Sequence, residues 1–226
     1  MFNQFAIRCN QVYETLRSGG FKALVKKTFC WNREIVFVEK NLLAFDSESK
    51  PRAEDNLQVI EITEQVSCDN KKLLYPLKSR HLKVRKNLAR GYGAFAVIRN
   101  TEVLGDVWYV SSDSWEKNCK HPDLKWLGLR LAPREAYMFD MFTDPQKRGK
   151  GLVNYLFNCS LEALKKRGFE RVYGYYEVDN LPALWMNRTM GFKERQRIKL
   201  KKFFSLTKAE VINSPNCLRK KNTYED

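Results

Sequence analysis

The chain has 226 residues, 43% of them hydrophobic and 13% aromatic, which is enough apolar material for a folded core and argues against a disordered chain. Its 41 Lys and Arg exceed its 26 Asp and Glu, and the resulting charge of +15 favours nucleic acid, an anionic membrane surface or an acidic small molecule as a partner. No apolar run approaches the roughly 18–20 residues that span a bilayer, and the first residues lack the pattern of a secretory signal, so the sequence predicts a cytoplasmic protein.

The N-terminal segment, residues 3–29, has a helical pattern that is interrupted at Ser18-Gly19-Gly20. After the interruption, Phe21, Leu24 and Val25 fall on one face of the helix, and lysines lie elsewhere on it. Such a helix can lie on an anionic membrane or dock on the rest of the protein. The short apolar stripe favours docking, and peripheral membrane contact is the alternative.

The remaining elements alternate between strands and helices. Strands are predicted at 33–40, 57–63, 137–143 and 171–178, with a last strand or hairpin at 192–206 and a β-hairpin at 93–110 that turns near Asn100-Thr101. Helices are predicted at 77–90, at 151–167 and from residue 179 onward. The segments 41–56 and 111–134 read as a linker and a long loop. This order predicts a mixed sheet with helices packed on it, an α/β (or α+β) fold.

The six cysteines are scattered along the chain and form no C-x-x-C pair. Because there are also only two histidines, the sequence predicts no metal site, and we expect reduced thiols. The cysteines are Cys9, Cys30, Cys68, Cys119, Cys159 and Cys217.

Basic residues are concentrated in two places. Nine Lys and Arg and no Asp or Glu lie between Lys71 and Thr101, and a second cluster of basic residues lies within the segment 192–206. Charge alone would suit a nucleic acid, but no recognised nucleic-acid-binding motif is present, so this function ranks last and no specific nucleic acid is expected.

An anion site is predicted where the apolar run 137–143 passes through a basic, glycine-containing turn into a helix. The turn is Asp144-Pro145-Gln146-Lys147-Arg148-Gly149-Lys150-Gly151, and the helix opens with Leu152 and Val153. Glycines let the backbone approach a phosphate closely, and the first N–H groups of a helix have no partner within it. A ligand that carries phosphate is therefore expected here.

The segment 136–192 resembles the GNAT superfamily of acyl-CoA-dependent N-acyltransferases. The resemblance rests on the turn, the strand 171–178, the helix start Asn180-x-x-Ala183 and the following Gly191-Phe192, all in the family's order. It extends over about residues 57–206 and implies a single acyltransferase domain there. Residues 1–56 would then be a helical and strand extension with a linker, and residues 207–226 a C-terminal tail.

Two registers of the turn fit the family's motif. Reading from Gln146 gives Q-x-x-G-x-G, whereas the register that begins at Pro145 replaces the last glycine with Val153. In either register the resemblance implies that backbone N–H groups from Arg148 to Val153, through Gly149, Lys150, Gly151 and Leu152, hold the diphosphate of acetyl-CoA or another acyl-CoA. It also implies that the strand backbone near Phe142 and Thr143 pairs with the pantetheine arm, and that Asn180 and Asn187 contribute to binding the cofactor.

Three carboxylates are candidates for the base that takes the proton of the attacking amine. Glu135 begins the central strand where some family members place a catalytic Glu. Asp140 lies inside the same apolar strand, on the opposite face from Glu135 by alternation, where it needs a partner or a cleft. An ion pair with an Arg accounts for it equally well. Glu177, near the end of the next strand, is the third candidate.

The general acid is in question, because family members often carry a Tyr seven residues after the Asn and this chain has Asn187 there. An amide can donate a hydrogen bond to sulfur but cannot supply a proton as a phenol does. Tyr173, Tyr175 and Tyr176 on the preceding strand are substitutes, although strand aromatics are often core residues. This departure also leaves open a catalytically inert CoA-binding module.

The acceptor is expected to be a small molecule with a primary amine. The basic helix 77–90 and the loop 111–134 occupy places that border the acceptor cleft in similar proteins, and basic side chains suit an anionic, sugar-like acceptor. Trp115 and Trp126 could stack on a sugar or a base, or could simply anchor the loop. The sequence does not predict an oligomeric state.

Overall fold

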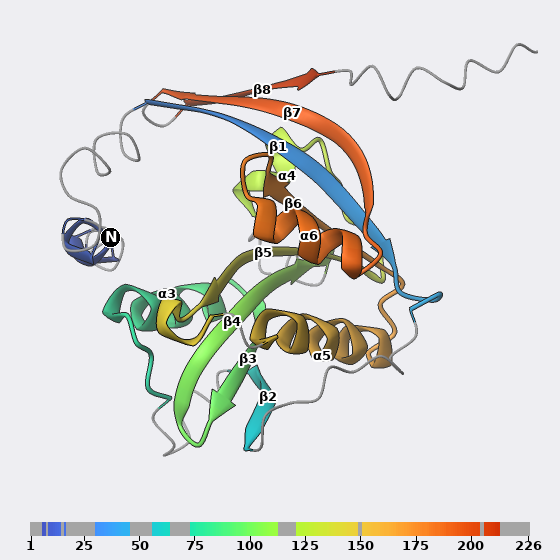
Figure 1. Cartoon of the computed structure of the whole chain (residues 1–226). Coiled ribbons are helices and arrows are strands. Elements are labelled where there is room, and N and C mark those ends of the chain that lie inside the picture. Colours follow the sequence, from blue (N-terminus) through green and yellow to red (C-terminus); the bar gives the residue numbers. More distant parts are fainter. Residues whose placement is uncertain are drawn as a thin grey trace, which may run out of the picture.

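The computed structural model describes residues 6–7, 9–14, 16, 30–45, 56–63, 73–112, 121–148, 151–203 and 206–212. Eight strands form one sheet in the order β2-β3-β4-β5-β6-β1-β7-β8 (Figure 1). The strands are β1 (Cys30–Asn41), β2 (Leu57–Ile62), β3 (Gly93–Arg99), β4 (Glu102–Ser111), β5 (Glu135–Thr143), β6 (Arg171–Glu177), β7 (Lys193–Phe203) and β8 (Leu206–Ile212). All neighbours are antiparallel except β5 and β6, so the predicted mixed sheet is confirmed.

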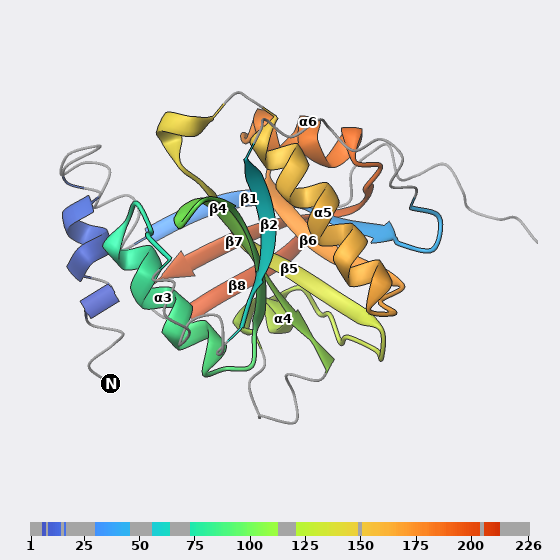
Figure 2. The same cartoon turned by 90° about the horizontal axis from the view of Figure 1, so that it is seen from below.

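Helices cover both faces of the sheet (Figure 2). They are α3 (Lys78–Leu88), α4 (Pro122–Trp126), α5 (Leu152–Lys166) and α6 (Leu181–Thr189). The helices α5 and α6 share one buried cluster with the sheet, and α3 and α4 share the other. The predicted α/β fold is therefore confirmed, with the short helix α4 lying inside the segment that was predicted to be a loop.

The strand β1 lies inside the sheet, between β6 and β7, although it is the first described strand of the chain (Figure 1). Both of its faces are buried, since Ile35 and Phe37 join one core cluster while Val36 and Val38 join the other. The sequence predicts the strand but not its place between β6 and β7. The last strand, β8, is not predicted and forms an edge of the sheet.

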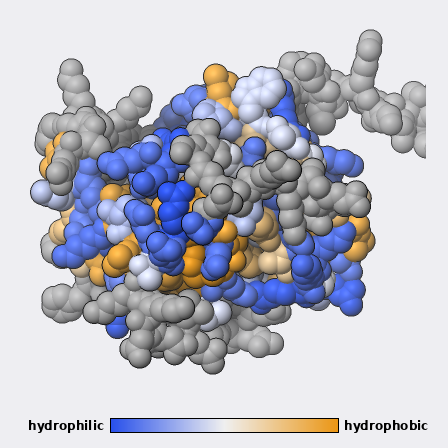
Figure 3. Space-filling view, turned by 60° about the horizontal axis from the view of Figure 1, so that its bottom comes forward, coloured by the Kyte–Doolittle hydropathy of each residue, from blue (hydrophilic) through white to orange (hydrophobic). Residues whose placement is uncertain are grey.

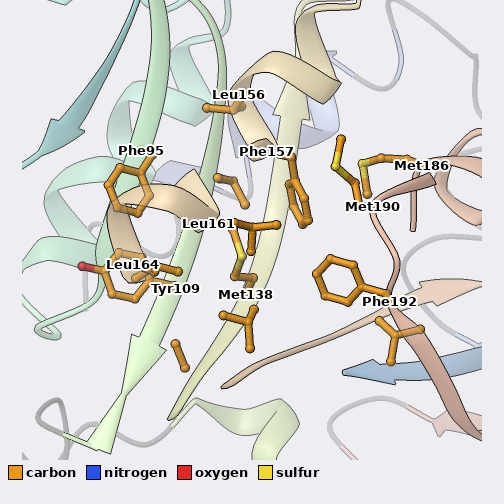
Figure 4. Packing of buried hydrophobic residues seen from close by; sticks show 14 of the residues in the cluster. Phe95, Tyr109, Met138, Leu156, Phe157, Leu161, Leu164, Met186, Met190 and Phe192 are labelled. Atoms are coloured by element: carbon orange, nitrogen blue, oxygen red, sulfur yellow. The ribbon is translucent and has the colours of Figure 1, made fainter. Parts of the chain in front are cut away.

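The core on the α5 side is built from one apolar face of that helix. Leu156, Phe157, Leu161 and Leu164 point toward the sheet, where Met138 and the ring of Phe192 meet them (Figure 4). Complete burial of such a side chain stabilises a fold by about 1.5–3 kcal/mol. This packing fixes the position of α5 against the strands and hence the position of its N-terminus.

The strand β5 contains a β-bulge at Asp140. Trp108 of β4 pairs with Phe139 and Asp106 pairs with Phe142, so one residue of β4 faces both Asp140 and Met141. Asp140 has a φ of 49°. The extra residue resets the alternation, and Asp140 reaches α3 on the face that also holds Tyr137. The expectation that Asp140 faces away from the side of Glu135 is therefore wrong.

The parallel pairing of β5 with β6 is short. It runs only from Glu135 opposite Arg171 to Tyr137 opposite Tyr173. Beyond these pairs, residues 138–143 of β5 and 174–177 of β6 do not pair with each other. Each strand therefore turns an unpaired backbone edge toward the other.

Part of the N-terminal segment is helical, at residues 6–7, 9–14 and 16. Ile7 is buried, and the Glu14 carboxylate accepts hydrogen bonds from the Ser79 backbone N–H at 3.1 Å and hydroxyl at 2.5 Å. These contacts dock the described part of the segment on α3. The predicted apolar stripe from Phe21 onward lies outside the described residues.

Hydrophilic side chains cover most of the described surface on the face that Figure 3 shows, around a smaller hydrophobic area. Within the described residues, no helix is long and apolar enough to cross a membrane.

Two strand glycines give a matched test of the bulge geometry. A Cβ on Gly105 would lie 2.8 Å from the Phe142 carbonyl oxygen, whereas a Cβ on Gly174 would have its nearest neighbour, the Met138 carbonyl oxygen, at 3.6 Å. We expect Gly105→Ala to lower the free energy of unfolding by about 1–3 kcal/mol through overpacking. Gly174→Ala should change it by no more than about 0.5 kcal/mol. Denaturant unfolding of both variants measures the difference, and equal losses would contradict the geometry.

Candidate active site

The N-terminus of α5 is open to an anion. Its cap, Gly151, makes no side-chain hydrogen bond to the helix, and the first turn has no acidic residue. The first intrahelical bond is from Tyr155 N–H to the Gly151 carbonyl, so the N–H groups of Leu152 and Val153 have no hydrogen-bond acceptor among the described residues. These groups and the helix dipole attract negative charge.

The other described α-helices have an acceptor at this end. His121 caps α4, Asn180 caps α6, and Glu14 accepts from the first turn of α3. The contrast shows that α5 differs from the rest of the described fold in leaving its N–H donors available.

The turn before α5 is fixed at both ends. Asp144 is buried, donates its N–H to the Leu104 carbonyl at 2.8 Å and accepts from Gln146 N–H at 3.0 Å. Gly151 has a φ of 71°, a conformation that favours glycine. Arg148 is exposed, while Gly149 and Lys150 lie outside the described residues. Of the backbone N–H groups predicted to bind the diphosphate, those of the described residues 148 and 151–153 lie at the N-terminal end of α5.

The unpaired edge of β5 leads to this turn, because β5 runs directly into it. Phe142 and Thr143 pair with Asp106 and Gly105 of β4 on one edge, and on the other edge no described strand pairs with them. The opposite edge can therefore exchange hydrogen bonds with an extended amide-containing chain.

A buried arginine holds the bulge of β5. Arg80 of α3 donates from Nε at 3.0 Å and from Nη2 to the two oxygens of Asp106. It also donates to the Asp140 carboxylate at 2.7 Å and to the Asp140 carbonyl oxygen. The side chains of Arg80 and Asp106 are 5% and 0% exposed. The sequence did not single out Arg80, which is one of nine basic residues in its segment.

Asp140 is held as a carboxylate. Burial by itself would raise its pKa, but the charges and hydrogen bonds of Arg80 and of Lys83, whose Nζ lies 3.1 Å away, outweigh this and leave the pKa below its usual value. A carboxylate with a lowered pKa is a weaker base than an ordinary one. The ion pair that the sequence offered as an alternative for Asp140 is present.

The other two candidate bases differ in position. Glu135 lies on the paired part of β5, where its oxygens accept from Arg171, from the Tyr173 hydroxyl and from the Ala132 N–H. Glu177 lies on the part of β6 that does not pair with β5, and its carboxylate forms an ion pair with Arg33 of β1. Only Asp140 and Glu177 therefore lie where the strands have separated.

A set of polar and aromatic side chains lies on the face of the sheet that α3 and α4 cover, and the sequence analysis missed most of them. Asp123 of α4 accepts from the Tyr137 hydroxyl at 2.9 Å and from Trp126 Nε1 at 3.1 Å. The ring of Trp126 meets the ring of Tyr175 edge-on at 5.4 Å. His121 Nδ1 accepts from Asp123 N–H at 3.3 Å. Only Trp126 and Tyr175 carried a signal in the sequence, as aromatic residues in a loop and on a strand.

The two asparagines of the motif serve α6 itself. Asn180 Oδ1 accepts from Ala183 N–H at 3.2 Å and caps the helix. Asn187 is buried and donates from Nδ2 to the Ala183 carbonyl at 2.8 Å.

Comparison with known sequences points to one family. A model of the Acetyltransferase (GNAT) family matches residues 61–192, which is more than half of the chain. An uncharacterized N-acetyltransferase of Methanocaldococcus jannaschii is 33% identical over 77 residues, 34% of each protein. A mycothiol acetyltransferase of Clavibacter michiganensis subsp. michiganensis is 33% identical over 69 residues, 30% of this chain and 22% of that protein. The matched stretches thus span about a third or less of these relatives.

Solved structures of the same family share the fold. A tandem GNAT protein from the clavulanic acid biosynthesis pathway has a TM-score of 0.53 at 12% identity, over 78% of this chain and 53% of that one. The glucosamine N-acetyltransferase region of a fungal multi-domain β-N-acetylglucosaminidase has a TM-score of 0.51 at 15% identity, over 75% of this chain and 21% of that one. At these identities the likeness is one of fold.

Loss of the buried arginine should destabilise the protein. We expect Arg80→Leu to lower the free energy of unfolding by about 3–5 kcal/mol, because it leaves the Asp106 carboxylate buried without its partner. Arg134→Leu, which removes an exposed pair with Glu170, is the control and should cost less than about 1 kcal/mol. Denaturant unfolding measures both, and similar losses would show that Arg80 does not hold a buried charge.

The free energy of unfolding should depend on pH through His121. Burial is the main cause that lowers its pKa, against the raising effect of Asp123 and Asp140. The unfolded chain therefore binds the proton more readily, and the stability contributed by neutral His121 is lost as the pH falls below about 6.5. His121→Asn keeps a capping side chain without the titration. We expect the free energy of unfolding to fall less between pH 7 and pH 5 in this variant, and parallel curves would contradict the assignment.

Proposed function

The chain belongs to the GNAT family of acetyltransferases, as its sequence predicts, and from this premise we propose that it transfers an acetyl group from acetyl-CoA to the primary amine of a small molecule. The observation that carries the proposal is the uncapped N-terminus of α5 at the end of a strand whose free edge faces β6. The relative named mycothiol acetyltransferase supports a small-molecule acceptor.

The described residues fit acetyl-CoA at two places. The N–H groups of Leu152 and Val153 and the exposed Arg148 suit its diphosphate. The unpaired edge near Phe142 and Thr143 suits the amides of its pantetheine arm. Asn180 and Asn187, whose predicted role was also in binding, would act through α6, because both already bond to that helix.

The reaction we propose is direct attack. The neutral amine nitrogen forms a bond to the thioester carbonyl carbon, the carbon–sulfur bond breaks, and CoA leaves as a thiolate. The nitrogen then loses its extra proton as the amide forms, and the thiolate takes up one proton, so the protons of this step balance. The attacking amine must first lose a proton from its ammonium form. We propose Glu177, in preference to Glu135 and Asp140, as the base that accepts this proton. Glu177 lies on the unpaired stretch with 34% of its side chain exposed, Glu135 lies on the paired stretch, and Asp140 is the weaker base.

Tyr175 is the phenol that we propose as donor to the departing sulfur. Among the described residues its hydroxyl makes no hydrogen bond, whereas Tyr173 bonds to Glu135 and Tyr176 bonds to Glu194. Burial, followed by the charges of Asp123 and Glu177, raises the pKa of Tyr175, so the phenol keeps its proton at neutral pH.

An inert CoA-binding module is the alternative, and Asn187 in place of a tyrosine favours it. A sugar-like or anionic acceptor would be attracted by α3, which exposes Lys78 and Arg85 and has no acidic residue, and it is the alternative to an amine with an aromatic or apolar group. A nucleic-acid function is third and rests on charge alone. Steep salt dependence of binding to arbitrary DNA or RNA would support it.

The test is acetyl-CoA binding by calorimetry, followed by thiol release with a panel of amines. We expect saturable binding and amine-dependent release. Binding without release for any amine would favour the inert module, and absence of binding would overturn the proposal.

Two glycines with the same backbone conformation separate binding from stability. Gly151 and Gly168 lie at opposite ends of α5, have φ of 71° and 86°, and have nothing within 4 Å of an added Cβ. Alanine at either position costs roughly 1–2 kcal/mol of stability. We expect only Gly151→Ala to weaken acetyl-CoA binding, by about tenfold, because it displaces the donor groups of the turn. Equal affinities of the two variants, measured by calorimetry, would place the diphosphate elsewhere.

A further inference from the structure

We propose that Asp123, Trp126 and Tyr175 form a subsite that holds the acceptor as an ammonium ion beside an aromatic or apolar group. The inference rests on the proposed acetyl transfer and names the chemical class of its acceptor. It begins from the charge of one carboxylate.

Asp123 is a carboxylate that no described cation neutralises. Its two oxygens accept only from neutral donors, the Tyr137 hydroxyl and Trp126 Nε1–H. The side chain is 21% exposed, so the carboxylate is within reach of solvent. Since a carboxylate has about four acceptor positions, Asp123 can accept further hydrogen bonds from a ligand.

The neighbouring carboxylates are neutralised in place. Asp140 is paired with Arg80 and Lys83, Glu177 with Arg33, and Glu135 with Arg171. Of these four carboxylates, Asp123 is therefore the one whose negative charge no described cation compensates.

His121 does not supply the missing positive charge. Its Nδ1 lies 3.7 Å from the Asp123 carboxylate but accepts the Asp123 N–H, so the neutral ring carries its proton on Nε2. Burial is the main cause that lowers the pKa of His121, and Arg90 acts in the same direction. The ring also packs against Phe139 with centroids 4.0 Å apart. His121 is thus an uncharged support for α4.

Aromatic rings border the carboxylate. Trp126, whose indole N–H is bonded to Asp123, meets the ring of Tyr175 at 5.4 Å and 68°. Tyr175 is 37% exposed. An ammonium ion beside a carboxylate and over an aromatic face gains a charge-assisted hydrogen bond and a cation–π contact. The rest of the acceptor would then lie against the same rings.

The subsite lies beside the stretch of β6 to which we assign the reaction. Tyr175 is on the stretch of β6 that does not pair with β5, two residues before Glu177. After burial, the charge of Asp123 contributes most to raising the pKa of the Tyr175 hydroxyl, and that of Glu177 contributes next. Both carboxylates therefore act on the same phenol, beside which we place the ammonium ion that is to lose its proton to Glu177.

Two ligands that differ only in charge test the inference. Calorimetry would measure binding of 2-phenylethylamine and of 2-phenylethanol to the full chain, and glucosamine 6-phosphate would represent an anionic acceptor. We expect the amine to bind at least about tenfold more tightly than the alcohol, and Asp123→Asn to remove this preference. Equal binding of amine and alcohol, an unchanged preference in Asp123→Asn, or tighter binding of glucosamine 6-phosphate would overturn the proposal.

Controls separate charge from folding and from the proposed function. Glu102→Gln removes an exposed carboxylate on the β3–β4 hairpin and should leave the preference unchanged. Trp126→Phe keeps an aromatic ring without the bond to Asp123 and should reduce the preference about threefold, which keeps the test decisive if Asp123→Asn does not fold. The comparison needs no turnover. Absence of acetyl-CoA binding would therefore overturn the proposed function, while the ammonium preference is read separately.

Discussion

The buried guanidinium of Arg80 is the contact on which the site depends. A charge with 5% exposure is tolerable only because Asp106, Asp140 and a carbonyl oxygen of β5 all accept from it. The same bonds hold Asp140 at a φ of 49°, and the bulge there accompanies the separation of β5 from β6 beyond Tyr137. Charge balance in the core and the free strand edges are therefore two consequences of one arrangement. A protein without this arginine would have to bury the Asp106 carboxylate unpaired and leave Asp140 to Lys83 alone, or close the bulge.

The site is electrically polarised along its length. At the α5 end there are unpaired N–H groups, a helix dipole and no acidic residue in the first turn. At the α4 end there is Asp123, whose hydrogen-bond donors are neutral. An anionic donor substrate and a cationic acceptor are thus each favoured at one end and disfavoured at the other. This polarity would order the two proposed substrates without a contact between them, and it would allow a chain with a charge of +15 to select the ammonium ion that we propose as acceptor.

Local patterns predicted those elements whose structure is local. The strand, turn and helix around residues 137–167, the hairpin near Asn100 and the start of a helix at Asn180 follow from spacing and turn chemistry. The place of β1 between β6 and β7 does not, because pairing partners are far apart in sequence. Alternation also misplaced Asp140, since a bulge shifts the period. Two acidic residues in apolar strands, Asp106 and Asp140, were the available signal that a buried cation must exist. The sequence could not say which of nine basic residues it was.

The replacement of a tyrosine by Asn187 changes where a proton donor can come from. Asn187 is buried and bonded to its own helix, so α6 offers no exposed group at that position. Of the tyrosines on β6, Tyr173 and Tyr176 are held by glutamates, and each would have to break that bond to act. Tyr175 needs no such change, and its position on the unpaired stretch puts a phenol and Glu177 on the same strand face. A single strand would then supply both the donor to sulfur and the acceptor from the amine. The proton that leaves the amine and the proton that the thiolate takes up would then both be handled by side chains of β6, without a group from α6.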